Sequence, residues 1–201
     1  MKTLKTFFFA ALLFLSCVTF AQATVLTFDD VITDHFVALQ DGYGGLDWNK
    51  MYVANSTHAA LANSGYAVGS VSGDNVAFNA NGSLAEVNGD TFDFYGAYLT
   101  GAWRDGLSVR IQGFLGDALL CDKTVVTSAF TAQFFDFNFF GVDLLKFTSF
   151  GGTEVANYPE GDGPHFAMDN FSFNANPVPE PATLLLLGLG LLGIAGLRRQ
   201  K

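Results

Sequence analysis

The feature of this 201-residue chain that most constrains its architecture is an apolar segment close to its C-terminus. Residues 182–197 carry no charge, and Leu, Gly, Ile and Ala would occupy every side of a helix formed there. Such a helix spans about 24 Å, slightly less than a relaxed membrane span. The basic residues Arg198, Arg199 and Lys201 follow it, and clusters of this kind favour the cytoplasmic side. We predict a transmembrane helix over 182–197 and a cytoplasmic tail over 198–201, in preference to a buried core helix.

The N-terminus carries a second targeting segment. Two lysines precede an apolar run over residues 7–20, and residues 21–23 (Ala-Gln-Ala) form a small-x-small cleavage site. We predict a signal peptide over 1–23 and a mature chain that begins at Thr24. A lipoprotein processed at Cys17 is a weaker alternative, because an aromatic residue stands where a branched aliphatic one is usual three positions earlier.

The remaining residues, 24–174, are the size of one ordinary domain. Fifteen Asp and three Glu stand against five Lys and Arg in this region, which makes it strongly acidic. This charge argues against nucleic acid and anionic lipid as partners and suits neutral ligands or divalent cations. Cys121 is the only cysteine left after the leader, so we expect a small buried side chain and no intrachain disulfide.

The domain pattern is that of β-structure. Short runs rich in β-branched and aromatic residues are separated by Gly, Asn and Asp, and the alternation is clearest over 107–112 and 135–139. Asn81-Gly82 and Asn88-Gly89 flank residues 84–87 and predict a hairpin. We expect roughly ten strands in an all-β antiparallel sandwich. Further predicted strands cover 24–28, 92–94, 98–103, 145–148 and 166–173.

The apolar positions of the last predicted strand change parity at Asp169-Asn170. A β-bulge there would re-aim Asp169 and still leave Phe166, Met168, Phe171 and Phe173 available for the core.

The C-terminal segment resembles a known signal. Pro179, Glu180 and Pro181, the apolar span with its four glycines, and the terminal Arg198 and Arg199 together resemble a PEP-CTERM sorting signal. The resemblance implies an exported protein that an exosortase-type enzyme processes, in a bacterium that makes extracellular polysaccharide. Residues 175–181 then form a linker with the Pro-Glu-Pro motif.

The domain resembles the uncharacterised ectodomains often attached to such tails, which are similar to galactose-binding-like jelly rolls. This resemblance implies a jelly-roll-like β-sandwich. The residues that carry it are Phe28-Asp29-Asp30, Tyr43 to Trp48, Ser64-Gly65, Asn75 to Asn79 and Asp169-Asn170-Phe171.

One candidate site is a structural calcium ion. Calcium takes six to eight oxygen ligands from carboxylates and carbonyls on irregular backbone. The first and last strands of a jelly roll can lie together, so Asp29, Asp30, Asp169 and Asn170 are the predicted ligands. The alternative is that these residues cap strand ends and carry solubilising charge.

A second candidate is a carbohydrate platform. An exposed aromatic ring with a few aimed polar groups suits a sugar, and Trp48, Tyr43, Trp103 and Arg104 are the predicted contacts. The alternative is that either Trp belongs to the core.

No catalytic motif is found, and the three histidines are far apart in the sequence. We therefore expect a non-catalytic, membrane-anchored protein of the cell surface or extracellular matrix that binds extracellular polysaccharide. The alternative is a structural component that associates with itself or with another exported protein.

Overall fold

The computed structural model describes residues 23–156 and 163–175. The predicted signal peptide, the Pro-Glu-Pro motif, the transmembrane helix and the basic tail lie outside these residues. Within the described ranges, no helix has both the length and the apolarity needed to cross a membrane.

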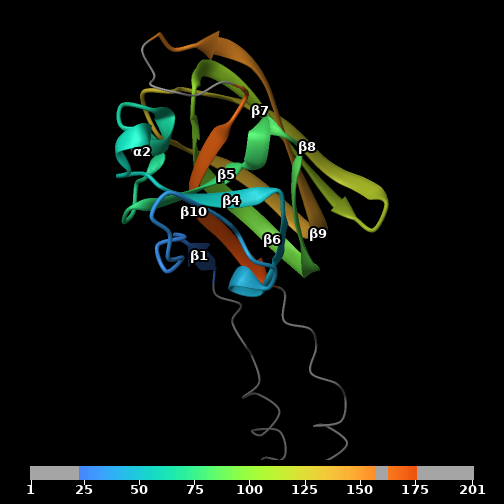
Figure 1. Cartoon of the computed structure of the whole chain (residues 1–201). Helices are drawn as coiled ribbons and strands as arrows, with labels where there is room; N and C mark the ends of the chain where they lie inside the picture. The colour runs from blue at the N-terminus through green and yellow to red at the C-terminus, as the bar shows by residue number, and fades with distance from the viewer. Residues whose placement is uncertain (1–22, 157–162, 176–201) are drawn as a thin grey trace, which may run out of the picture.

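Antiparallel strands dominate the described chain (Figure 1), which confirms the predicted all-β antiparallel class. The helical elements are the 3₁₀ turns η1 (Tyr43–Gly45), η2 (Ala59–Leu61) and η3 (Ala80–Gly82) and the short helix α2 (Gly65–Gly69). The strands are β1 (Thr24–Leu26), β2 (Phe36–Ala38), β3 (Asp47–Asn49), β4 (Met51–Asn55), β5 (Asn75–Asn79), β6 (Ala85–Gly101), β7 (Arg104–Leu115), β8 (Ala118–Thr127), β9 (Gln133–Glu154) and β10 (Phe166–Ala175).

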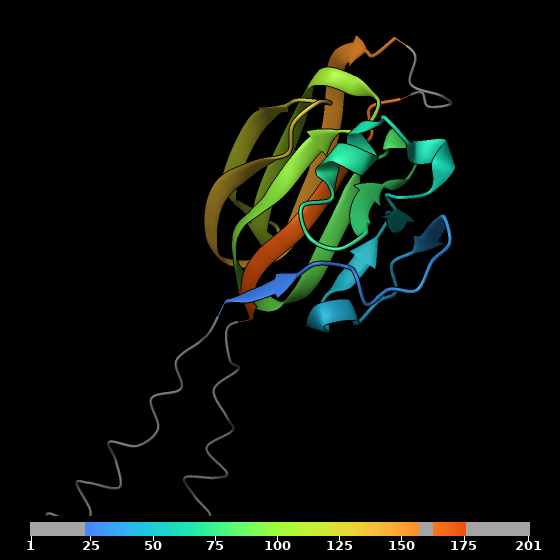
Figure 2. The same cartoon turned by 90° about the vertical axis from the view of Figure 1, so that its left-hand side faces the viewer.

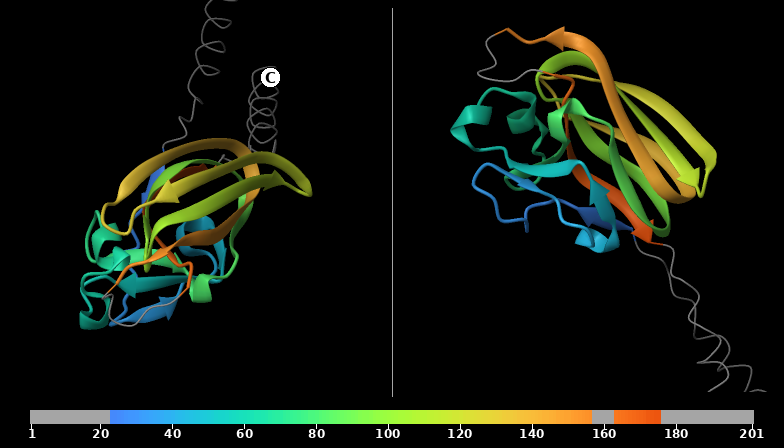
Figure 3. Two further views of the ribbon diagram at one scale, coloured as in Figure 1. Left: turned by 90° about the horizontal axis from the view of Figure 1, so that it is seen from above. Right: turned by 45° about the vertical axis from the view of Figure 1, so that its right-hand side comes forward.

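The strands form one hydrogen-bonded, ten-stranded sheet in the order β2-β4-β5-β10-β6-β9-β7-β8, with β1 on β10 and β3 on β6. The sheet is strongly curved, and β7, β8 and β9 form a layer that stands apart from β4 and α2 (Figure 3). Register shifts within the β6–β9 pair let these two long strands bend.

The main core lies inside this curve and is largely aromatic. Phe94 stacks on Phe171 with 4.7 Å between ring centroids, and Phe147 stacks on Phe166 at 5.7 Å. All four rings are fully buried, so the abundant Phe of the sequence supplies the apolar surface that stabilises the fold.

A second, smaller apolar cluster lies on the opposite face of β4, β5 and β10. In β5, Ala77 belongs to the main core, whereas Val76 and Phe78 belong to the second cluster. In β10, Met168 belongs to the main core and Ala167 to the second cluster. Neighbouring side chains on a strand point to opposite faces, so this part of the sheet is buried on both sides.

The predicted bulge in β10 is confirmed. The pairing of β10 with β6 shifts between Asp169 and Ser172, and Asn170 has a left-handed backbone with φ of 52°. Phe166, Met168 and Phe171 are all buried as expected.

The predicted hairpin around residues 84–87 is wrong. Asn81 and Gly82 do form a turn with φ of 54° and 61°, but β10 lies between the two strands that flank it. Asn88 and Gly89 lie inside β6. Asn81 and Gly82 determine where the chain turns. They do not determine which strands pair, because β10 is inserted between β5 and β6.

Two carboxylates hold the segment that follows α2. Asp169 is fully buried and accepts hydrogen bonds from the amides of Val71 and Ser72, both at 2.8 Å. Asp29 accepts from the amides of Asp74 and Asn75 at 2.9 and 3.1 Å. Burial raises the pKa of Asp169, and the hydrogen bonds from Ser72 and Val71 oppose that rise.

We expect Asp169→Asn to lower the free energy of unfolding by about 2–4 kcal/mol, because the amide NH₂ would face backbone donors in a buried site. Urea unfolding measures the change. The exposed Asp90 provides the control, and Asp90→Asn should shift stability by less than about 0.5 kcal/mol. Equal effects of the two substitutions would contradict the structural role of Asp169.

Candidate functional site

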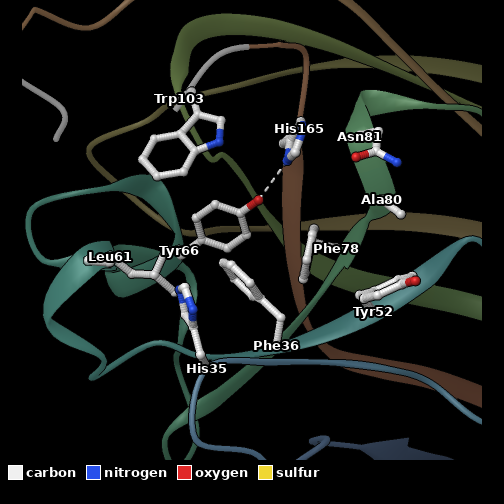
Figure 4. Close-up of a pocket in the computed structure, with 11 residues that line it drawn as sticks. His35, Phe36, Tyr52, Leu61, Tyr66, Phe78, Ala80, Asn81, Trp103 and His165 are labelled. Carbon is white, nitrogen blue, oxygen red and sulfur yellow. Dashed lines mark hydrogen bonds between the residues drawn. The ribbon is translucent and has the colours of Figure 1, made fainter. Parts of the chain in front are cut away.

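An aromatic pocket lies over the second apolar cluster, on the outer face of β2, β4 and β5 (Figure 4). Its volume is about 450 Å³, within the range of small-molecule sites. The residues that line it are His35, Phe36, Tyr52, Ala60, Leu61, Tyr66, Phe78, Ala80, Asn81, Trp103 and His165.

Adjacent strands place one wall of the pocket. Tyr52 on β4 lies directly opposite Phe78 on β5, with their ring centroids 5.9 Å apart. Phe36 on β2 packs against Phe78 at 5.3 Å. Phe36 and Tyr52 are 42% and 36% exposed, so parts of their surfaces are open to solvent.

Helix α2 places the facing wall through Tyr66. The Ser64 hydroxyl accepts a hydrogen bond from the Tyr66 amide and caps the helix. Gly65 donates its amide to the Ala102 carbonyl at 2.9 Å, and a Cβ on Gly65 would stand 1.9 Å from the Gly101 carbonyl oxygen. Only glycine permits this approach, which brings the Tyr66 ring to 5.2 Å from Trp103.

A tyrosine–histidine pair joins the two walls. The Tyr66 hydroxyl lies 2.7 Å from Nδ1 of His165, as the dashed line in Figure 4 shows. Burial raises the pKa of Tyr66, so its phenol stays protonated and can donate to Nδ1 when His165 carries its proton on Nε2. The backbone holds His165 in place, since its carbonyl accepts from the Ala102 amide at 2.9 Å.

A second histidine of the lining, His35, contacts a third histidine that lies outside the lining. The rings of His35 and His58 stack with 3.9 Å between centroids, although 23 positions separate them in the sequence. His58 also accepts a hydrogen bond from the Ala60 amide and so caps η2. Burial, and then the charge of His58, lower the pKa of His35.

The chemistry of the lining is aromatic and polar without a permanent charge. It includes no Asp, Glu, Lys or Arg among the described residues, in a chain whose net charge is −9. Aromatic surface together with hydroxyl, amide and imidazole groups suits an uncharged ligand that has one apolar face and several hydroxyls.

The four predicted sugar contacts do not form one site, because Trp48 and Tyr43 pack together at the main core, whereas Trp103 lies at the pocket. Trp103 forms part of the pocket wall. The adjacent residue Arg104 forms an ion pair with Glu154, with 3.0 Å between nitrogen and oxygen. Trp48 is only 4% exposed and donates its indole N–H to the Tyr43 carbonyl at 2.9 Å, so both of its ring faces lie in the main core, away from this pocket.

Three of the four predicted calcium ligands contact residues 71–75, and the four do not meet at a common point. Asp29 and Asp169 hold opposite ends of residues 71–75 by accepting amide hydrogen bonds. Asp30 accepts from the Tyr43 hydroxyl at 2.7 Å, and Asn170 from the Ser72 hydroxyl at 2.9 Å. In the described part of the chain, no three Asp, Glu, His or Cys side chains come together as a metal-holding group.

Sequence reasoning missed most of the pocket. The signal that pointed to it is the uninterrupted apolar run Val76-Ala77-Phe78, since a strand without alternation is typical of burial on both faces. No sequence signal links His35 to His165, because the strand pairing that brings both to the pocket is non-local.

Comparison with known proteins identifies the C-terminal segment. Residues 177–200 match the model of the PEP-CTERM protein-sorting motif. This match confirms the predicted sorting signal, including Pro179, Glu180, Pro181, Arg198 and Arg199. A search of curated protein sequences finds no match.

Several solved structures are similar to the chain at low identity. A DUF4465 family protein from Bacteroides ovatus has 10% identity and a TM-score of 0.45, covering 78% of this chain and 95% of its own. TmCBM61 in complex with β-1,4-galactotriose has 10% identity and a TM-score of 0.38, with coverages of 70% and 98%. CBM51 from Clostridium perfringens GH95 in complex with methyl-galactose has 11% identity and a TM-score of 0.34, with coverages of 76% and 100%.

We expect the protein to lose stability as the pH falls below about 6.5. His35 has a lowered pKa in the folded chain, so the unfolded chain takes up the proton first and gains free energy from it. Urea unfolding at pH 7.5 and 5.5 measures the loss. His35→Phe should make the loss smaller; an identical loss in the variant would contradict the role of His35.

The calcium site at Asp29, Asp30, Asp169 and Asn170 stays a prediction. A structural calcium ion binds the folded chain alone and stabilises it, so EGTA should lower the melting midpoint. A thermal melt with and without EGTA, with excess calcium restoring the midpoint, is the measurement. An unchanged melting midpoint would contradict a structural calcium ion in this domain.

Proposed function

We propose that this chain is an exported, non-catalytic surface or matrix protein whose aromatic pocket binds an uncharged carbohydrate. The single observation that carries the proposal is the pocket itself, with exposed ring surface from Phe36 and Tyr52 beside polar groups of Asn81 and His165. A sugar ring presents an apolar face and a rim of hydroxyls, and each finds a matching group here.

The proposed location comes from the sorting motif at residues 177–200. It supports export, and we propose that the apolar helix over 182–197 holds the chain in the inner membrane until an exosortase-type enzyme processes it. We also propose that residues 1–23 are a signal peptide and that the exported domain is a jelly-roll-like sandwich.

The form of the site favours a binding role over hydrolysis. Glycosidases use a pair of carboxyl groups across the scissile bond, whereas the described lining residues offer rings, amide and imidazole. A pocket of about 450 Å³ has room for one or two sugar units, which favours the end of a glycan chain as the ligand.

Removing the two exposed rings should weaken binding. We expect Phe36→Ala combined with Tyr52→Ala to lower glycan affinity at least about tenfold, or roughly 1.4 kcal/mol, because the stacking surface is lost. A glycan array identifies the ligand, and calorimetry then measures its affinity. Phe140 is 60% exposed and lies outside the pocket, so Phe140→Ala is the matched control and should bind normally.

Two outcomes would contradict carbohydrate binding at this site. One is a native protein that binds nothing on the array or on extracellular polysaccharide. The other is a double variant that retains native affinity while folding normally.

Self-association is the second candidate function, and the edge of the sheet favours it. Strand β8 lies at one end of the described strand order and exposes Leu119, Leu120 and Val126. An apolar edge strand can pair with a second copy of the chain.

Light scattering of the purified protein without glycan tests this candidate. We expect an oligomer that Val126→Lys converts to monomer, because the added charge opposes edge pairing. A native protein that stays monomeric at all concentrations would exclude self-association through β8.

A further inference from the structure

The two ends of the described domain meet at one pole of the molecule. Strand β1 pairs with the last part of β10, with Thr24 opposite Phe173. Ala175 lies opposite Phe92. Figures 1 and 2 show the chain entering and leaving at this same pole.

The pocket belongs to the other half of β10. His165, which immediately precedes the strand, lines the pocket. Ala167 is part of the apolar cluster beneath the pocket and lies opposite Phe78 of the pocket wall. Ala167 and Ala175 are eight positions apart in β10. At about 3.3 Å per residue, and with a small reduction for the bulge, the pocket floor lies roughly 25 Å from the chain exit.

The sorting motif begins at residue 177, two positions after the end of β10. A surface that binds the motif must therefore lie near the pole where β10 ends, because only a short length of chain connects the two. Residues 176–181 are the only ones between the end of β10 and the proposed anchor over 182–197, and a chain of that length reaches at most about 20–25 Å.

From these positions we propose that the chain, while held by its C-terminal segment, presents the pocket away from the surface that holds it. The carbohydrate that it binds then belongs to a layer separate from that surface. This inference rests on the proposed anchoring of residues 182–197 and on the proposed function of the pocket, and it adds the direction in which the site faces.

Energy transfer from the protein to lipid headgroups tests the direction without any glycan. The mature full-length chain carries Cys121→Ser and one new cysteine, in phosphatidylcholine vesicles that contain an acceptor dye on the headgroup. Ala62→Cys places the donor dye beside the pocket residue Leu61, and Thr91→Cys places it beside Phe92 at the exit pole. Both positions are exposed, so neither label should disturb folding.

We expect transfer from the label at position 91 to be at least about twofold more efficient than transfer from the label at position 62. Equal or reversed efficiencies would overturn the proposed direction. Since no carbohydrate is present, such a result would leave the proposed binding function to be judged by the affinity of the Phe36 and Tyr52 variants.

Discussion

The structure depends on the burial of β10 on both of its faces. One face gives Phe166 and Met168 to the main core, and the other gives Ala167 to the smaller cluster under the pocket. A central strand that is apolar on both sides must be covered twice. The curved sheet covers one side, while η2, α2 and their connections cover the other and create the aromatic pocket.

This double burial explains which features could be predicted from the sequence. Local alternation predicted the strands around Val109 and Phe137, and the parity change at Asp169 predicted the bulge, because both signals are carried by neighbouring residues. The pairing of β5 with β10 joins residues about ninety positions apart in the chain, such as Phe78 and Ala167, and the pairing of β6 with β10 is also non-local, from Gly101 with Phe166 to Phe92 with Ala175. The turn residues Asn81 and Gly82 are a local signal, so they cannot predict pairing with a strand that lies so far along the sequence.

The candidate site was partly predictable for the same reason. Trp103, one of the predicted sugar contacts, lines the pocket, but the other residues of the lining come from β2, β4, β5 and α2 and were not predicted. Trp48 was a predicted sugar contact, but its ring packs edge-on against Phe28 and Phe171 in the core. Trp48 is the buried central residue of the short strand β3, and the burial of its large apolar ring is strongly favourable.

The hydrogen bonds of Asp29 and Asp169 have one more consequence for the pocket. They fix residues 71–75, and this segment follows α2 after a single residue, Ser70. The helix that carries Tyr66 is thus held at its start by Gly65 against Ala102 and at its exit by buried carboxylate. The proposed carbohydrate would meet a wall whose shape is already set, so little of its binding free energy would be lost to ordering the protein.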